Sequence, residues 1–120
     1  MKQYLKIPLF VVAILFAFVW TSQLSAQSNH RTENVAGTTW VGTDSDGDYY
    51  EYNFQTNGAM FYKSPTGFWK NGTWVQKGSS IYMETNKKYS EYKGQIFGTH
   101  MEGTAWNIKD RKWTWVADKK

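Results

Sequence analysis

One short motif recurs three times along this chain and constrains what the chain can fold into. The copies are Gly37-Thr38-Thr39-Trp40, Gly72-Thr73-Trp74 and Gly103-Thr104-Ala105-Trp106, and Lys112-Trp113-Thr114-Trp115 repeats their character further on. Threonine and tryptophan suit the half-buried surface of a β-sheet, and glycine marks a place where a strand bends or another backbone comes close. We therefore expect each copy to lie on a β-strand.

Turn signals separate eight short segments of this kind. They predict strands at residues 38–43, 49–54, 59–63, 68–77, 80–85, 89–97, 99–108 and 112–117. Short strands with a turn about every 8–12 residues are typical of all-β barrels and sandwiches. Every connection is short enough for a hairpin, so we predict a small antiparallel up-and-down meander, closed or nearly closed into a barrel. The barrel would span residues 37–117, with 118–120 as a frayed tail and an interruption of the fourth strand at Asn71-Gly72.

The core of such a barrel has to be built mainly from aromatic side chains. No leucine follows Leu24, and residues 27–120 contain ten Val, Ile or Met against six Trp, seven Tyr and four Phe. One buried aromatic side chain removes about 150–250 Å² from water, which replaces the missing leucine. The chain has no cysteine, so its stability must come from packing and hydrogen bonds without disulfides. We expect Trp40 and Trp74 to be largely buried.

The first 26 residues have the layout of a secretory signal peptide. Two lysines precede an apolar run at residues 7–20, and Ser25-Ala26 offers a cleavage site. The run is shorter than the roughly 20 residues that span a bilayer, and an uncleaved anchor is the alternative. We predict a secreted or periplasmic protein without stable membrane insertion after cleavage. Residues 27–36 would form a flexible arm.

Removal of this leader lowers the net charge. Two lysines and no acid leave with it, so residues 27–120 carry 12 basic and 10 acidic side chains, a net charge of +2. A charge this small does not favour nucleic acid as a partner.

The predicted meander places its loops alternately at the two ends of the barrel. One end, the charged-loop end, receives the loops at 44–48, 64–67, 86–88 and 109–111. These loops carry several acids and most of the loop lysines, whereas the loops at the other end are tight and mostly uncharged. We interpret the charged-loop end as the mouth, if the barrel has one.

At this level the chain resembles the small calycin-like barrels of the lipocalin and avidin type. Their first strand carries a Gly-x-Trp motif, and Gly37-Thr38-Thr39-Trp40 stands in that position with one extra residue. The resemblance covers residues 37–117. It implies an up-and-down barrel with the tryptophan closing one end. The chain is also similar to short exported lipocalin-like proteins.

Our leading hypothesis is a non-enzymatic exported barrel that binds a small apolar or aromatic ligand at the charged-loop end. Two alternatives use an outward aromatic face: a protein-interaction or inhibitor module, and a carbohydrate-binding module. The candidate ligand-binding residues are Tyr50, Tyr52, Lys87, Lys88, Lys109 and Arg111.

An acidic cluster in the first loop is a candidate for cation binding. Asp44, Asp46 and Asp48, with Glu51 nearby, could present carboxylate oxygens to a hard cation. Gly47 precedes the third Asp and both flanks are predicted strands, which departs from a helix-flanked calcium loop. A solvated hairpin turn is the competing interpretation, and it explains the same residues.

The sequence does not favour catalysis. It contains no Cys nucleophile, and His100 is the only histidine of the predicted barrel, since His30 lies in the arm. Neither histidine has the spacing of a metal ligand. A barrel with short loops also offers little cleft in which to position two carboxylates. We therefore predict no enzymatic activity and no cofactor.

Overall fold

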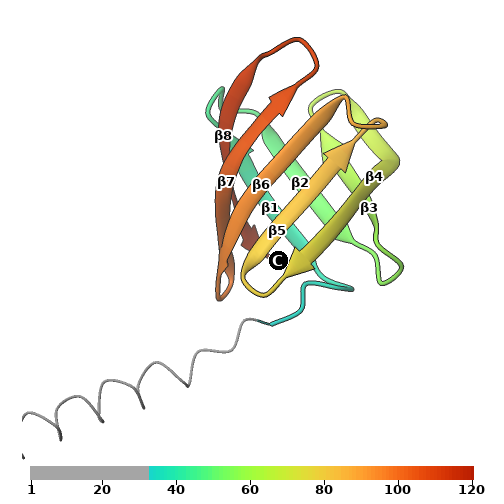
Figure 1. Ribbon diagram of the computed structural model, residues 1–120, viewed down its shortest axis with the longest axis vertical. Coiled ribbons are helices and arrows are strands. Elements are labelled where there is room, and N and C mark those ends of the chain that lie inside the picture. The colour runs from blue at the N-terminus through green and yellow to red at the C-terminus, as the bar shows by residue number, and fades with distance from the viewer. Residues whose placement is uncertain (1–32) are drawn as a thin grey trace, which may run out of the picture. The chain divides into compact units, whose positions relative to one another are not determined.

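Each strand of this protein pairs with the next one along the chain, and the last pairs with the first. The computed structural model describes residues 33–120 (Figure 1). The strands are β1 (Thr39–Asp44), β2 (Tyr49–Phe54), β3 (Ala59–Ser64), β4 (Gly67–Lys77), β5 (Ser80–Thr85), β6 (Ser90–Phe97), β7 (His100–Asn107) and β8 (Lys112–Lys119). All pairings are antiparallel and the sheet closes between β1 and β8. The predicted eight-stranded meander barrel is confirmed, and its architecture is calycin-like.

Part of the predicted N-terminal organisation lies outside the described residues. This applies to the signal peptide at 1–26 and to residues 27–32 of the arm. Within the remaining part of the arm, Val35 is buried in the barrel core, and its backbone N–H donates to Gln76 Oε1 at 2.9 Å. The core therefore includes a residue that precedes the first motif. Residues 33–120 contain no helix long and apolar enough to cross a lipid bilayer.

Aromatic and methionine side chains fill the barrel. The largest fully buried side chains are those of Trp40, Trp115, Tyr52, Phe54, Met60, Met83 and Met101. Aromatic rings pack edge to face in this core, as with Tyr52 and Trp115, whose ring centroids lie 6.1 Å apart. Trp40 is buried as predicted. Trp74 is only partly buried, because it lies near a barrel end, where its indole N–H donates to the carbonyl of Gln55 at 2.9 Å.

The predicted interruption of the fourth strand is a β-bulge inside one continuous strand. On β3, Met60 pairs with Gly72 and Tyr62 pairs with Trp69, so one β3 residue stands opposite two β4 residues. A Cβ atom at position 72 would lie 2.6 Å from the carbonyl oxygen of Met60, so only glycine fits without a shift. The bulge bends β4, as bulges do in barrel walls.

A carboxylate on the outer wall is buried under two lysines. Glu51 is 5% exposed, and its carboxylate oxygens lie 2.9 Å from Lys120 Nζ and 3.2 Å from Lys63 Nζ. The backbone N–H of Lys120 also donates to the carbonyl of Thr39 at 2.9 Å. β8 thus runs two residues beyond the predicted strand end at 117, since these contacts hold it against β1 and β2.

The Glu51 cluster predicts a pH dependence of stability. The hydrogen bond from Lys120 has the largest effect on the pKa of Glu51 and lowers it. Burial opposes this effect, and the hydrogen bond from Lys63 adds to it, so that the pKa lies below its ordinary value of 4.5. A lowered folded-state pKa means that the stabilisation is complete above pH 4.5 and is lost as the pH falls through the folded pKa. We expect Glu51→Gln to lower the free energy of unfolding by about 1 kcal/mol at pH 7. The variant should also lose less stability than the parent as the pH falls. Urea unfolding from pH 7 to pH 3 measures both. An unchanged pH profile in the variant would contradict this role.

Candidate functional site

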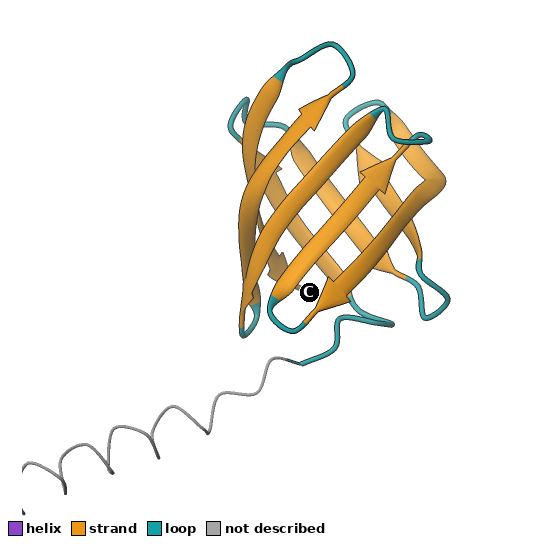
Figure 2. Ribbon diagram, in the orientation of Figure 1, coloured by secondary structure: helices purple, strands orange, loops and turns teal. Residues whose placement is uncertain are grey.

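The charged-loop end is built from the four loops that the meander brings together. Figure 2 shows the loops gathered at two opposite ends of the strands, and the loops after β1, β3, β5 and β7 share one end. Because the strands follow chain order around the barrel, the β1–β2 loop faces the β5–β6 loop across this end. The β3–β4 loop likewise faces the β7–β8 loop.

Two charged residues confirm the predicted gathering of loops. Arg111 of the β7–β8 loop forms an ion pair with Asp46 of the β1–β2 loop, although 65 residues separate them in sequence. Asn107 Oδ1 accepts hydrogen bonds from the backbone N–H groups of Lys109 and Arg111, at 3.0 and 3.2 Å, and so shapes the loop that presents them. Arg111 also lies over an aromatic ring, with its Cζ 5.9 Å from the centroid of Trp113.

The acidic cluster of the β1–β2 loop is used largely for the turn itself. Carboxylate oxygens of Asp44, Asp46 and Asp48 all lie within 4.8 Å of one another. Asp44 Oδ1 accepts hydrogen bonds from the backbone N–H groups of Asp46 and Asp48, at 2.9 and 3.0 Å. Asp46 is paired with Arg111. These partners account for the carboxylates of Asp44 and Asp46 within a hairpin turn, and we assign no cation to the cluster.

Lys87 and Lys88 occupy a strained turn at the opposite side of the mouth. Asn86, Lys87 and Lys88 all have positive φ angles, of 50°, 52° and 64°. Side chains other than glycine reach this region at a cost of about 1–2 kcal/mol each. Both lysines are exposed, and Lys88 Nζ lies 3.9 Å from Glu84 Oε2. The turn therefore places both residues at the rim, and the ammonium group of Lys88 lies near Glu84.

Partly exposed aromatic rings line the inside of this mouth. Tyr50 and Trp113 are partly buried and pack against the core. Tyr50 stacks on Tyr52 with ring centroids 6.1 Å apart and nearly parallel planes. Trp113 meets Tyr92 edge to face at 5.9 Å. Tyr52 itself is 2% exposed, so it supports Tyr50 from below and offers no free surface of its own.

Several hydroxyl-bearing side chains lie at this end of the barrel. Burial, the carboxylates of Asp44 and Asp48 and, more weakly, that of Asp46 raise the pKa of Tyr50, while Arg111 opposes them. Burial and the neighbouring phenols of Tyr50 and Tyr62 likewise raise the pKa of Tyr92. These phenols remain protonated at neutral pH and can donate hydrogen bonds. The side chains of Thr85 and Ser90, which pair across β5 and β6, are also buried at this end.

Trp69 belongs to the mouth, and our sequence analysis missed it. It pairs directly with the inward-facing Tyr62, so both side chains share the inner face, yet Trp69 is 43% exposed. It lies on β4, across the barrel from Trp113 on β8. The sequence alone would not have singled it out, because Phe68 and Trp69 are adjacent aromatic residues and the bulge decides which of them faces inward.

The structure thus brings together only some of the predicted ligand-binding residues. Arg111 and Tyr50 lie close enough for the guanidinium charge to act on the phenol, and Lys109 is exposed in the same loop as Arg111. Lys87 and Lys88 lie on the far side of the mouth. Tyr52 lies below the surface. The arrangement can hold a flat apolar group against aromatic rings and a polar group against phenols and cations.

No protein-family model, curated protein or solved structure matches this chain. The assignment of a function therefore rests on the geometry of the barrel.

Proposed function

We propose that this protein is an exported, lipocalin-like barrel that binds a small apolar or aromatic ligand at its charged-loop end, without chemical conversion of the ligand. The observation that carries the proposal is the ring of inward-facing, partly exposed aromatic side chains at one end. Tyr50, Trp69 and Trp113 come from three different strands and share that end. Large aromatic side chains left partly exposed are typical of recognition sites.

The packing of the interior limits how deep such a ligand can sit. Tyr52 and Trp115 are each 2% exposed and contact each other below the rim. An eight-stranded barrel is just wide enough to be filled by its own side chains. The ligand would therefore lie in a shallow bowl on the aromatic rings, with its polar group directed to the loops. Export rests on the signal-peptide pattern of residues 1–26, and a secreted or periplasmic location stays a prediction.

The proposal predicts that rim aromatics control binding of a small aromatic probe. We use indole-3-acetate, which combines a flat apolar ring with an anion, and neutral indole. Trp113→Ala should weaken binding of both probes about fivefold, since it removes an aromatic contact worth roughly 1 kcal/mol. Titrations followed by NMR chemical shifts measure the dissociation constants.

A matched control separates the mouth from exposed aromatic surface in general. Phe97 is 59% exposed and ends β6 at the opposite end of the barrel, so Phe97→Ala should leave both constants unchanged. The double variant Lys109→Ser/Arg111→Ser should weaken the binding of indole-3-acetate more than the binding of indole. Equal effects of the Trp113 and Phe97 variants, or no binding of either probe, would count against the proposal.

A further inference from the structure

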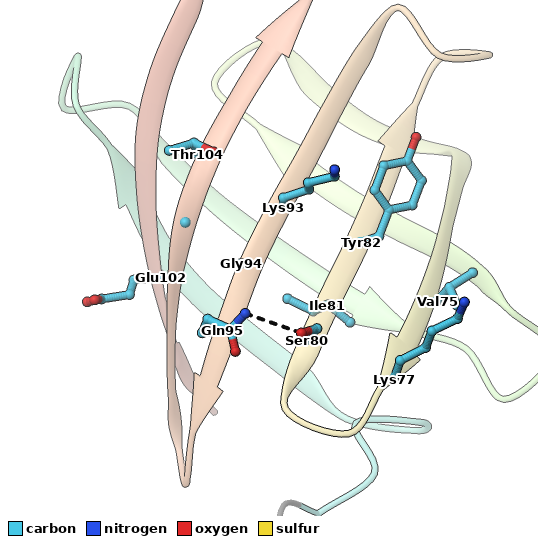
Figure 3. A pocket seen from close by; sticks show the side chains of 11 residues that line it. Val75, Lys77, Ser80, Ile81, Tyr82, Lys93, Gly94, Gln95, Glu102 and Thr104 are labelled. Atoms are coloured by element: carbon cyan, nitrogen blue, oxygen red, sulfur yellow. Dashed lines mark hydrogen bonds between the residues drawn. The ribbon is translucent and has the colours of Figure 1, made fainter.

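A second hollow lies on the outer wall of the barrel. It is a shallow groove of about 700 Å³ over β4, β5, β6 and β7 (Figure 3). Gly94 and Gly103 pair directly across β6 and β7 at inward-facing positions, and their backbone forms part of the groove's floor. Val75 and Tyr82 border the groove on one side. Its volume falls within the range of about 300–1,000 Å³ that is usual for ligand sites.

Polar side chains in the groove are held in fixed orientations. Gln95 donates through Nε2 to Ser80 Oγ at 3.2 Å, and its Oε1 accepts from the hydroxyl of Ser79 at 3.3 Å (Figure 3). The Tyr82 hydroxyl lies 2.6 Å from Glu91 Oε1 and 3.0 Å from Glu84 Oε2. The tyrosine ring is therefore anchored at its tip and presents its face beside the amide and hydroxyl groups.

The charge of the groove is positive. Lys77 of β4 and Lys93 of β6 stand on either side of β5, and neither forms an ion pair within residues 33–120. Glu102 is the one acidic residue among those that line the groove. Its carboxylate lies 3.2 Å from His100 Nε2 and points away from both lysines (Figure 3). The carboxylates of Glu84 and Glu91 lie at the tip of Tyr82 and are not among the lining residues, so the negative groups of a complementary ligand would lie at Lys77 and Lys93.

We propose that this outer groove binds an acidic oligosaccharide made of uronic acid residues. The C–H face of a sugar ring packs on Tyr82, and its hydroxyls match Ser80 and Gln95 as donors and acceptors. Its carboxylates match Lys77 and Lys93 through charge-assisted hydrogen bonds. The groove lies on the outside of the wall and the mouth lies at its end, so this inference does not rest on the proposed aromatic-ligand site.

The test titrates the protein with trigalacturonate and, in parallel, with the neutral trisaccharide maltotriose. Trigalacturonate should bind, and maltotriose should bind at least tenfold more weakly. Added salt should weaken the binding of trigalacturonate. Lys77→Gln and Lys93→Gln should each weaken trigalacturonate binding about two- to fivefold, the effect expected for one exposed ion pair. Tyr82→Leu, in a variant shown by circular dichroism to be folded, should weaken it about tenfold.

The matched control for charge is Lys70→Gln. Lys70 Nζ lies 5.4 Å from the ring centroid of Phe61, and Lys70 is outside the groove. The variant should therefore bind trigalacturonate as the parent does. Trp113→Ala should also leave trigalacturonate binding unchanged. No binding of trigalacturonate would overturn the proposal. So would equal loss in Lys70→Gln, equal affinity for maltotriose, or equal affinity for triglutamate, an anion of similar charge without sugar rings.

Discussion

Replacing Trp115 with alanine should lower the free energy of unfolding by about 3–5 kcal/mol, as large-to-small changes of a buried tryptophan do. Trp115 is 2% exposed and lies at the centre of the aromatic core. It meets Tyr52 and Tyr92 edge to face, each at 6.1 Å between ring centroids, and its indole N–H donates to the carbonyl of Thr104 at 3.1 Å. The loss is a large share of the roughly 5–15 kcal/mol that stabilises a small domain.

Thermal and urea unfolding of the variant measure this effect, and Thr114→Ala is the control on the same strand. Thr114 is exposed, so its replacement should change the unfolding free energy by no more than about 0.5 kcal/mol. If Trp115→Ala unfolded within a degree or two of the parent, Trp115 would not be a core residue. Tyr50 stacks on Tyr52, so loss of Trp115 should also loosen the support of the proposed mouth.

Adding one methyl group at Gly94 should cost about 1–3 kcal/mol, the usual effect of overpacking a core. A Cβ atom there would lie 2.7 Å from Trp115 Cζ2 and 2.7 Å from the carbonyl oxygen of Glu102. No rotation of the added methyl relieves these contacts. The indole ring, the backbone of β7, or both must move, and both help to form the wall that carries the outer groove.

A double variant tests whether the clash with the indole ring causes this loss. Combining Gly94→Ala with Trp115→Phe, which removes the atoms nearest the new methyl group, should cost less than the sum of the two single changes. Urea unfolding of the four proteins gives the coupling free energy. Strict additivity would assign the cost to the backbone contact with Glu102 alone.

The two proposed sites use different parts of the wall and can be separated by experiment. Trp113→Ala acts on the mouth, and Lys93→Gln acts on the groove. Each should leave the other site's ligand bound as in the parent. A protein with both sites would attach to an acidic glycan through its side and hold a small aromatic molecule at its end.

Local sequence determined the strands and the order of their pairing. Alternation along residues 49–54 predicted that Tyr50, Tyr52 and Phe54 share a face, and turn residues placed the hairpins within one or two positions. A meander leaves one arrangement of its loops, so the placement of Asp46 and Arg111 on the same rim followed from the strand count, and closure of the barrel brings the two into contact. The shortage of leucine likewise predicted an aromatic core.

Only the tertiary structure decided how deeply each side chain lies. Period-two alternation cannot distinguish Tyr50 at the rim from Tyr52 beneath it, because depth depends on strand tilt and on neighbours from other strands. Glu51 faces outward and is still buried, since Lys120 reaches it from 69 residues away. Trp69 faces the mouth because a bulge changes the register of β4, and the groove is formed by residues of four strands, β4 to β7. Each of these features depends on contacts between distant segments, which no local pattern encodes.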